Sequence, residues 1–524
     1  MPEAEVLRAD VLVIGCGMAG ASAAYQAAKA GLHVVVLTKE AAAEESNTLY
    51  AQGGIVTLGP DDNPALLGDD IMTAGDGLSN PAAVDVLTRD CRSLVEGILI
   101  GELEVPFARD ADGNLDYAQE ANHSRRRILH VADTTGRTIE GKFLAALSRM
   151  PNIRMLSGHT AVDLLTLPHH AKSPIAYYKE PRCLGAYVLD NAARKVRTIL
   201  AQTTVLAAGG CGAVFLNTSN PSGANGAGYA MAYRAAVRIV NMEYIQFHPT
   251  ILYHRDVPGF LISETVRGEG ARLKTLDGRT FMEKYSDQRD LAPRDEVARA
   301  IYEEMINGNA SHVLLDLASY ASIDVRERFP HIAATCARYG IDIARDPIPV
   351  VPAAHYCCGG VLVDEWGRTS LKGLYAVGEA ACTGLHGANR LASTSLLEGL
   401  VWGTRAARDI AERFRPASPI PDNGIHEWYY SKREEAIDPA LINQDWLTIR
   451  NTMWNYAGVL RRSKRLERAK ADLEYLRHRI EKFYKEAVMD ASLVGLRHGI
   501  EAALLIVNAA LANPVSAGAH FRID

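Results

Sequence analysis

The chain has 524 residues, of which 48% are hydrophobic and 23% charged, with a formal net charge of −6 at pH 7. This composition is typical of a globular protein, and its charge gives no electrostatic reason to expect nucleic acid or an anionic membrane surface as a partner. The eight cysteines lack any Cys-x-x-Cys spacing, which argues against an iron–sulfur or zinc site and against a secreted disulfide framework.

The N-terminal residues 1–6 are acidic and unlike an ordinary signal peptide. We expect no uninterrupted apolar run to reach the length of a membrane span. The sequence therefore predicts a cytoplasmic protein with no bound metal and no membrane contact.

Residues 9–40 predict one strand–turn–helix–strand unit whose turn reads Gly15-Cys-Gly-Met-Ala-Gly20. In this context the Gly-x-Gly-x-x-Gly pattern is typical of a dinucleotide site. Gly15 makes the tight turn, Gly17 lets a pyrophosphate approach the backbone, and Gly20 lets helix and sheet pack closely. The acidic residue usual at the end of the second strand is replaced by Lys39, which either reaches a cofactor phosphate or ribose or is a solvated strand end.

Residues 53–137 contain further features that bear on ligand binding and secondary structure. The pair Gly53-Gly54 allows backbone to lie flush against a flat ligand. Residues 69–107 are predicted to be helical, and residues 116–137 are dense in ionisable groups. Within that run, Arg125 and Arg126 are interpreted as a solvated face.

Residues 153–209 alternate in a way that predicts β-strands returning to the nucleotide sheet. A second domain is expected to begin near residue 246, with a helix over 296–307, and a later strand ends in Glu379, whose carboxylate suits a ribose hydroxyl. Arg390 precedes an apolar helix, and a guanidinium near a helix N-terminus is suited to an anion. Cys357 and Cys358 are interpreted as small buried thiols.

The proline-rich residues 416–421 predict a boundary. Amphipathic helices are expected beyond it, including one over 469–486, and the basic run 461–468 is interpreted as a solvated helix face.

Several motifs together identify a family. In chain order they are Gly15-x-Gly-x-x-Gly20, Ala51-Gln-Gly-Gly-Ile55, Phe247-His-Pro-Thr250, Arg267-Gly-Glu-Gly-Ala271, Leu291-Ala-Pro-Arg-Asp295, Ala354-His-Tyr356 and Gly387-Ala-Asn-Arg390. They resemble the succinate dehydrogenase and fumarate reductase flavoproteins, and within that family the aspartate-oxidising members. The similarity extends nearly from end to end.

The resemblance implies an α/β fold with three units. A glutathione-reductase-type, Rossmann-like FAD-binding domain would comprise residues 1–246 and 352–416. An α+β capping domain would comprise residues 247–351, and a C-terminal helical domain residues 422–524.

The resemblance also implies the site residues. His248 and Arg390 would hold one carboxylate of a C4 dicarboxylate, His355 would orient it, and Ser263 would contact a carboxylate. Arg294 would lie over the carbon that exchanges a proton, with Glu264 and Arg267 behind it as a relay. Arginine suits this task because it binds carboxylates bidentately and keeps its charge. An arginine in a proton-transfer role is awkward, since its ordinary pKa is above 12, so for amino-acid oxidation it would serve as an electrostatic anchor.

Two positions separate the members of the family. The histidine that bonds covalently to FAD in the respiratory flavoproteins is Asn47 here, so FAD should be noncovalent. Glu120 matches the carboxylate that faces the substrate ammonium in the aspartate-oxidising members. It would favour aspartate over succinate, because it pairs with that cation and repels a dianion that lacks it.

The resemblance assigns FAD contacts to many positions. They are Gly15, Gly17, Met18, Ala19, Gly20, Lys39, Asn47, Thr48, Ala51, Gln52, Gly53, Gly54, Val162, Ala208, Gly209, Glu379, Ser395 and Leu396. Ala227 and Thr394 depart from the family pattern, which has Asp and Asn there, and Ser263 and Cys357 replace frequent threonines.

The reaction implied is FAD-dependent oxidation of L-aspartate to iminoaspartate by hydride transfer to flavin N5, with electrons passed to O2, giving H2O2, or to fumarate, giving succinate. The family places this reaction first in de novo NAD synthesis, with quinolinate synthase consuming the product. One alternative is a soluble fumarate reductase or succinate dehydrogenase flavoprotein subunit. Another is a catalytically silent FAD-binding scaffold, since a fold alone does not specify a function.

Overall fold

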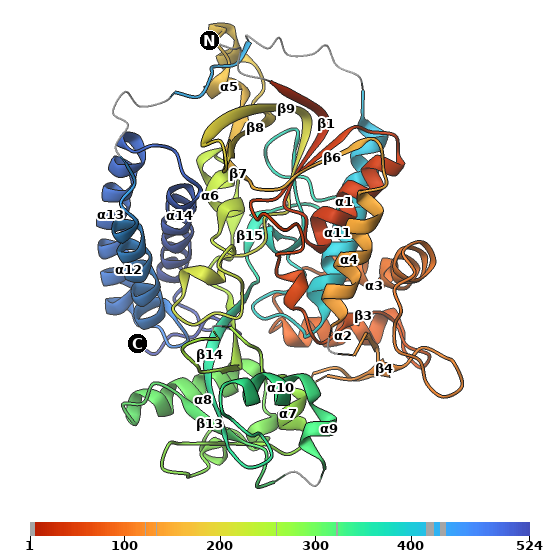
Figure 1. The fold of residues 1–524 in the computed structure, drawn as a ribbon, viewed down its shortest axis with the longest axis vertical. Coiled ribbons are helices and arrows are strands. Elements are labelled where there is room, and N and C mark those ends of the chain that lie inside the picture. The colour runs from red at the N-terminus through yellow and green to blue at the C-terminus, as the bar shows by residue number, and fades with distance from the viewer. Residues whose placement is uncertain are drawn as a thin grey trace.

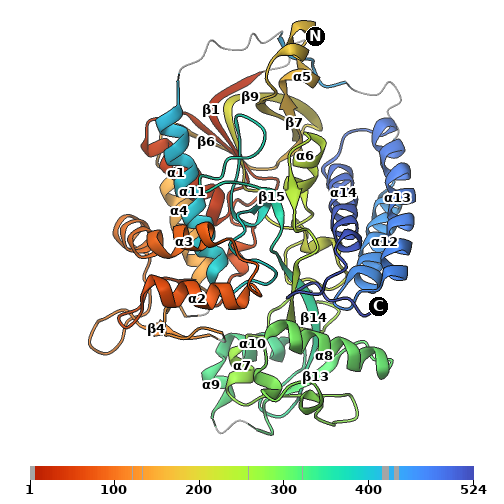
Figure 2. The same cartoon turned by 180° about the vertical axis from the view of Figure 1, so that it is seen from behind.

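A computed structural model describes residues 6–120, 122–132, 134–257, 259–320, 323–415, 424–429 and 436–524. A twisted sheet with helices beside it occupies the upper half of the molecule, a smaller unit lies below it, and a group of long helices lies along one side (Figures 1 and 2). The predicted proline-rich boundary at 416–421 lies outside the described residues.

The main sheet is parallel where it meets the Gly-rich turn. In spatial order its parallel strands are β6 (Ile153–Leu156), β2 (Val34–Leu37), β1 (Leu7–Ile14), β9 (Lys195–Leu206) and β16 (Leu374–Ala376). The strands β8 (Cys183–Asp190) and β7 (His159–Thr166) extend it in antiparallel fashion. The predicted return of the chain to the nucleotide sheet before residue 209 is therefore confirmed.

The central strand β1 is buried on both faces. Leu12 and Ile14 belong to one hydrophobic core, and Val11 and Val13 belong to the other. A strand buried on both faces needs an unbroken apolar run, which is what the sequence supplies here. On one side pack α1 (Met18–Lys29), α4 (Thr135–Leu147) and α11 (Thr394–Arg413).

Further elements surround this layer. They are α2 (Pro64–Ala74), α3 (Pro81–Leu94), the π-helix η2 (Val95–Glu102), α5 (Leu167–His170), α6 (Ala227–Arg234), the small sheet β3 (Ile55–Val56), β5 (Ile128–Leu129), β4 (Tyr117–Ala118), and the small sheet β10 (Ile239–Val240), β15 (Gly360–Leu362), β17 (Ala381–Cys382). Asn63 and Asn80 cap α2 and α3 through their side-chain oxygens, and each is followed by proline at the first helical position.

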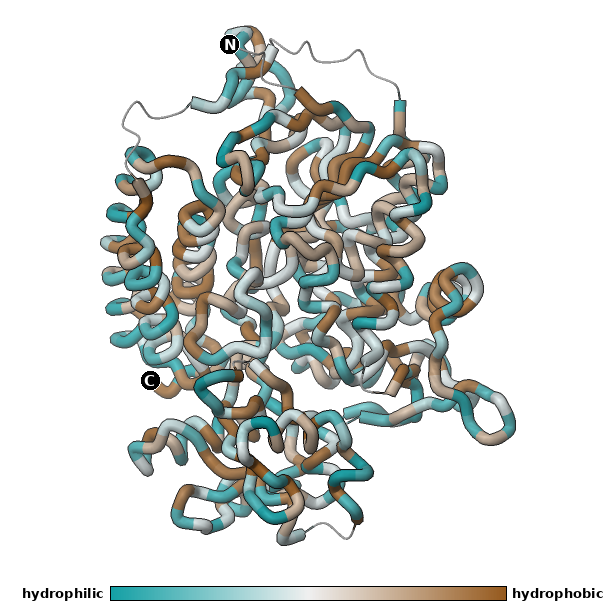
Figure 3. The backbone as a smooth tube through the Cα atoms, viewed as in Figure 1, coloured by the Kyte–Doolittle hydropathy of each residue, from teal (hydrophilic) through white to brown (hydrophobic). Residues whose placement is uncertain are grey.

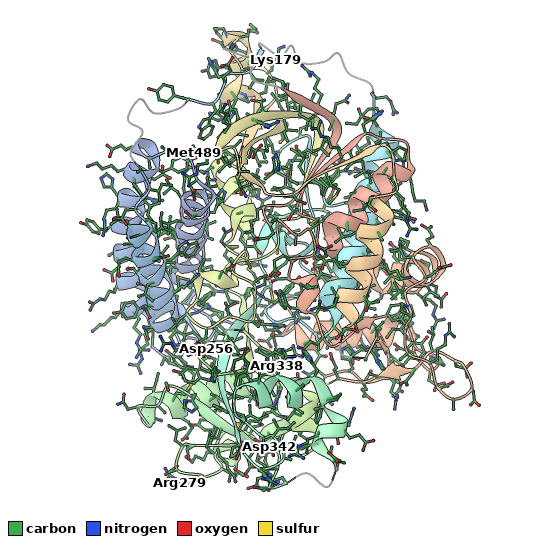
Figure 4. The ribbon with its side chains drawn as sticks, in the orientation of Figure 1. Lys179, Asp256, Arg279, Arg338, Asp342 and Met489 are labelled. Carbon is green, nitrogen blue, oxygen red and sulfur yellow. The ribbon has the colours of Figure 1, made fainter. Side chains whose placement is uncertain are left out.

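The lower unit, hereafter the cap, is built on one antiparallel sheet. Its strand order is β11 (Ile245–Leu252), β14 (Ile348–Cys357), β13 (Val313–Asp316), β12 (Arg272–Lys274). Its helices are α7 (Thr265–Gly268), α8 (Arg294–Asn307), α9 (Val325–Arg328) and α10 (Pro330–Arg338). Asp256, Arg279, Arg338 and Asp342 mark it in Figure 4. The proposed domain borders at 246/247 and 351/352 fall inside β11 and β14, so two paired strands join the units.

The long helices are α12 (Pro439–Ala457), α13 (Ser463–Glu486) and α14 (Ala491–Ala512), which confirm the expected C-terminal helical region. Figure 3 shows hydrophilic residues on the outer turns of α12 and α13 and more hydrophobic ones on α14. By length and composition α14 could cross a membrane. Arg497 and Glu501 interrupt its apolar run, so the expectation that no uninterrupted apolar run would reach that length is not contradicted. Because 78% of its apolar stretch is buried, against α12, α13 and α6, it packs as the core of this unit.

The interpretation of the basic run 461–468 as a solvated helix face is wrong for its first residue. Arg461 is not on a solvated helix face: its side chain is completely buried. Its Nη1 donates to the carbonyl of Glu243 at 2.6 Å, and its Nε donates to the carbonyls of Ala457 and Gly458. These backbone acceptors bind Nε and Nη1 of a guanidinium that the sequence pattern placed in water, whereas its buried Nη2 has no acceptor among the described residues.

Candidate active site at the junction of sheet, cap and helices

The turn after β1 leaves no room for side chains at Gly15 and Gly20. Gly15 has φ +107°, and a Cβ there would lie 2.2 Å from the carbonyl oxygen of Ala207. A Cβ on Gly20 would lie 2.0 Å from the carbonyl oxygen of Gly15. Thr48 Oγ1 accepts from the backbone N–H of Met18 at 3.0 Å, which joins the predicted Thr48 contact to the helix N-terminus. The turn therefore has the form that dinucleotide binding requires.

One cavity of about 660 Å³ begins at this turn and reaches the cap. This volume is in the range of small-molecule and cofactor sites. Its wall includes most of the positions expected to contact FAD, namely Gly15, Gly17, Met18, Ala19, Lys39, Asn47, Thr48, Ala51, Gln52, Gly53, Gly54, Ala208, Gly209, Glu379, Ser395 and Leu396. We call this stretch of the cavity the cofactor end.

The residues of the cofactor end fit a bound FAD. The cavity passes over Gly17, which offers backbone and no side chain. Three buried amide oxygens in the wall, Oδ1 of Asn47, Asn220 and Asn225, have no hydrogen-bond partner among the described residues. Buried polar atoms are rarely left unsatisfied, so these oxygens are suited to hydroxyl or N–H donors of a ligand.

Glu379 also faces this end of the cavity. One of its carboxylate oxygens accepts from Asn47 Nδ2 at 3.1 Å, and the other accepts from the backbone N–H of Cys357 at 3.0 Å. Burial raises the pKa of Glu379 to about 7. Asn47, the residue that replaces the covalent histidine, thus fixes the carboxylate predicted to meet a ribose. Cys357 and Cys358 are buried free thiols, as predicted.

Lys39 extends from the end of β2 into the cavity and donates to the carbonyl of Gly223. Burial lowers the pKa of Lys39 to about 8, against an opposing effect of Glu40. Lys39 is therefore not a freely solvated strand end, because its ammonium is partly buried in the cavity wall.

At the other end of the cavity lie His248, Arg294, His355 and Arg390, and we call this the substrate end. His248 and His355 come from the paired strands β11 and β14, and their ring centroids are 5.5 Å apart. Arg294 begins α8 in the cap, and Arg390 lies just before α11. Residues more than a hundred positions apart thus face one space.

The substrate end is positively charged through its arginines. Burial, with the neighbouring arginines, lowers the pKa of His248 and of His355 well below the ordinary value, so both imidazoles are neutral. Burial also lowers the pKa of Arg390, and on its own would lower that of Arg294, but Glu264 and Glu120 raise the latter above its ordinary value. Two guanidinium charges remain for a dianion.

Behind Arg294 lies a chain of ion pairs. Arg294 Nε donates to one oxygen of Glu264 at 2.5 Å, and Arg267 Nη2 lies 3.2 Å from the other oxygen. Arg267 is itself buried and donates to the carbonyl of Asp290. Arg267 does not reach the cavity, whereas Ser263 and Glu264 do.

Glu120 lies in the wall beside these arginines. One carboxylate oxygen accepts from the hydroxyl of Ser393 at 2.8 Å. Burial raises the pKa of Glu120, while Arg294, Ser393 and Arg390 oppose that rise. The substrate end thus combines fixed positive charges with one carboxyl group that is able to gain or lose a proton.

Arg390 rests on a buried network that the sequence did not reveal. Its guanidinium carbon lies 4.8 Å from the centre of the Tyr356 ring. The Tyr356 hydroxyl donates to Glu398 at 2.8 Å, and His386 Nε2 lies 2.9 Å from the same oxygen. Arg390 Nε has no acceptor among the residues that the structure describes, so it is available to a ligand.

Two predicted cofactor residues lie outside the cavity wall. Gly20 acts in helix–sheet packing, and Val162 is buried while its neighbour Ala161 lines the wall. Other residues of the wall were missed, notably Ser219, Tyr356 and Ser393, and a set from the C-terminal helices: Trp446, Arg450, Ala491, Ser492, Gly495 and His498. The helical pattern of those segments indicates a buried face but not what that face meets.

Comparison with known proteins agrees with this geometry. Residues 10–396 match the family model described as FAD binding domain, and residues 447–524 match fumarate reductase flavoprotein C-term. L-aspartate oxidase 1 of Ralstonia nicotianae is 45% identical and L-aspartate oxidase of Pseudomonas aeruginosa 42%, each over 98% of this chain and 95% of the relative.

The chain belongs to the L-aspartate oxidase family. FAD is therefore its cofactor, as predicted. Among solved structures, an E. coli quinol fumarate reductase has a TM-score of 0.88 at 26% identity, covering 99% of this chain and 92% of that chain. The Mycobacterium smegmatis Sdh1 complex in its apo form has a TM-score of 0.84 at 28% identity, covering 99% and 89%. The predicted fold class is confirmed: an aspartate oxidase sequence on the fold of the fumarate reductase flavoproteins.

Proposed function

We propose that the protein oxidises L-aspartate to iminoaspartate, with FAD accepting the hydride. The observation that carries the proposal is Glu120 in the same cavity as Arg294 and Arg390. Two guanidinium groups suit the two carboxylates of aspartate, and one carboxylate suits its ammonium. A dicarboxylate without the amine would leave Glu120 facing anionic oxygens with no cation between them.

The protein's own residues would bind and orient the substrate. Arg390 and His248 would hold one carboxylate, and His355, whose Nδ1 lies 2.7 Å from Ser219 Oγ, would orient the molecule. A fixed geometry matters because hydride transfer requires the reacting atoms to be aligned. When bound, the flavin supplies the acceptor for the hydride from Cα.

Glu120 has a second task in this proposal. The substrate ammonium must lose a proton before the nitrogen lone pair assists departure of the hydride. A carboxylate whose pKa is raised by burial is a suitable acceptor for that proton. Arg294 would act as an electrostatic anchor in aspartate oxidation, and its contacts with Glu264 and Arg267 would serve a proton relay when fumarate is reduced.

The proposal also covers the electron acceptor, the cellular location and the place of the reaction in metabolism. Electrons would pass to O2, giving H2O2, or to fumarate, giving succinate. The enzyme would be cytoplasmic, would hold FAD noncovalently because Asn47 offers no nucleophilic ring nitrogen, and would begin de novo NAD synthesis, with quinolinate synthase consuming its product. The fold is also that of a fumarate reductase, but Glu120 favours the aspartate-oxidising reaction.

The test is anaerobic mixing of the FAD-loaded protein with L-aspartate and, separately, with succinate. We expect rapid bleaching of the flavin absorption band by aspartate and slow or no bleaching by succinate. Glu120→Gln should slow bleaching by aspartate about 10- to 100-fold, because it removes a hydrogen-bonded charge pair, and should leave fumarate reduction within about threefold. The exposed Glu180→Gln is the matched control. Bleaching by succinate alone would move the protein to the respiratory branch, and bleaching by neither would favour a silent scaffold.

A further inference from the structure

Ser393 has an unusual backbone conformation for its position. It lies directly before α11 with φ 57° and ψ 12°, in the left-handed region that non-glycine residues seldom occupy. A serine before a helix normally accepts a hydrogen bond from a backbone N–H of the first turn. Here its side chain makes no such bond. Both the backbone and the side chain thus depart from the usual role of a helix-capping serine.

The hydroxyl is directed instead at Glu120. It donates to Glu120 Oε2 at 2.8 Å across a separation of 273 residues. No other hydrogen bond from the part of the chain that the structure describes reaches this carboxylate. The orientation of Glu120 in the protein without substrate therefore depends on Ser393.

The segment that carries Ser393 is held from several directions. Val56 N–H donates to the carbonyl of Ser393 at 3.2 Å. His123 Nε2 lies 3.0 Å from the carbonyl oxygen of Ala392, and Thr394 Oγ1 donates to the carbonyl of Leu391 at 2.6 Å. These hydrogen bonds hold Ser393 in its strained conformation. Strained residues held in this way are common at functional sites.

The side chains of Glu120 and Ser393 also pack against the backbone of Gly53. A Cβ added to Gly53 would lie 2.6 Å from Glu120 Oε1 and 3.2 Å from Ser393 Oγ. Gly53 therefore admits the Glu120–Ser393 pair without a side chain in between, and it blocks movement of the carboxylate in that direction. The absence of a side chain at Gly53 thus serves this pair as well as the cofactor.

We propose that Ser393 is a specificity-determining positioning residue, whose hydroxyl orients the Glu120 carboxylate in its ionised form toward the substrate ammonium. This inference rests on the proposed function, in which Glu120 meets that ammonium. A glycine would occupy the left-handed conformation with less strain, so the turn alone gives no reason for a serine. The hydroxyl gives one, because a donor favours the charged carboxylate over the protonated one.

The variant Ser393→Gly tests this directly, because glycine accepts the left-handed backbone conformation and removes the side chain that carries the hydroxyl. We expect kcat/KM for L-aspartate to fall about tenfold, since a hydrogen bond to a charged group is lost. Fumarate reduction and the dissociation constant of FAD should change less than threefold. Ser148→Gly, at the end of α4 and outside the cavity wall, should change none of these quantities.

The pH profile is a second readout that a merely structural role would not move. Removing a donor from the ionised carboxylate raises its pKa. The acid limb of kcat/KM for aspartate should therefore shift to higher pH in Ser393→Gly. An unchanged acid limb, or equal losses with aspartate and fumarate, would overturn the proposal. If the glycine variant proves unstable, Ser393→Ala can replace it. This variant also lacks the hydroxyl, so we expect the same shift of the acid limb.

A double-mutant cycle separates this inference from the function beneath it. If Ser393 acts through Glu120, adding Ser393→Gly to Glu120→Gln should cause no further loss with aspartate. Additive losses would overturn the role of Ser393 while leaving that of Glu120 intact. If Glu120→Gln alone fails to distinguish aspartate from fumarate, the ammonium-binding role of Glu120 is wrong, and the inference about Ser393 is overturned with it.

Discussion

The two ends of the cavity bind by different physical means. The substrate end carries Arg294, Arg390 and Glu120, whose charges are desolvated and held by other side chains. The cofactor end includes glycines where a side chain would collide, such as Gly15 and Gly54, and it also carries the Lys39 ammonium. One end therefore depends on the side chains that are present, and the other on the side chains that are missing.

This difference separates binding of substrate from retention of cofactor. A substitution at the substrate end should change turnover and leave FAD in place. A substitution at the Gly-rich turn should release FAD and leave the charges of the substrate end intact. Three variants, taken from the largest expected effect to the smallest, test the separation.

Arg390→Leu should have the largest effect. Truncating one member of a buried charged set costs roughly 2–5 kcal/mol, so we expect kcat/KM for aspartate to fall at least about 30-fold while the flavin spectrum and FAD content stay normal. Steady-state kinetics with a flavin absorbance ratio measures both. The exposed Arg126→Leu is the control. Loss of FAD together with activity would contradict the separation, because it would make Arg390 part of the cofactor end.

Gly20→Ala should act at the opposite end. The added methyl would meet the carbonyl oxygen of Gly15 at 2.0 Å, and overpacking of this kind costs roughly 1–3 kcal/mol. We expect about 10- to 100-fold weaker FAD binding, measured by quenching of flavin fluorescence, with near-normal turnover once FAD is saturating. Gly141→Ala, in α4 with nothing within 4 Å of the new methyl, should bind FAD normally. Normal FAD affinity in Gly20→Ala would show that the turn can relax.

For Lys39 we expect a smaller effect, which is a pH dependence of FAD binding. Burial lowers its pKa to about 8, so in the free protein the ammonium is fully present below pH 7 and is lost as pH rises through 8. Because a phosphate favours the protonated form, the dissociation constant of FAD should rise about tenfold between pH 7 and pH 9. Lys39→Met should remove this dependence, and the exposed Lys195→Met should keep it. A flat profile in the unmodified protein would exclude a phosphate contact by Lys39.

The fold could largely be predicted because its signals are local. The Gly-rich turn follows a strand that is apolar on both faces, and the helical region has an apolar stripe at helical spacing. The substrate end was assembled from motifs far apart in sequence only through the family resemblance. Its neutral histidines and the raised pKa of Glu120 arise from burial in the folded state, which no motif expresses.

The missed and misplaced residues have particular physical reasons. Val162 lies one residue from Ala161, and in a strand one residue changes the face on which a side chain lies. Ser393 could not be linked to Glu120, because that bond depends on a left-handed backbone angle and on a partner 273 residues away. Arg450 and Ser492 lie in the region where the sequence predicts amphipathic helices, and the pattern of a helix does not identify what its buried face contacts.

The position of α14 ties the stability of the C-terminal region to the supply of flavin. This apolar helix packs against its helical neighbours, and its residues Ala491, Ser492, Gly495 and His498 line the cavity wall. A ligand that binds only the folded chain adds about 2.7 kcal/mol of stability at a hundredfold excess over its Kd. A chain without FAD lacks that contribution, so we expect saturating FAD to slow proteolysis of the C-terminal helices.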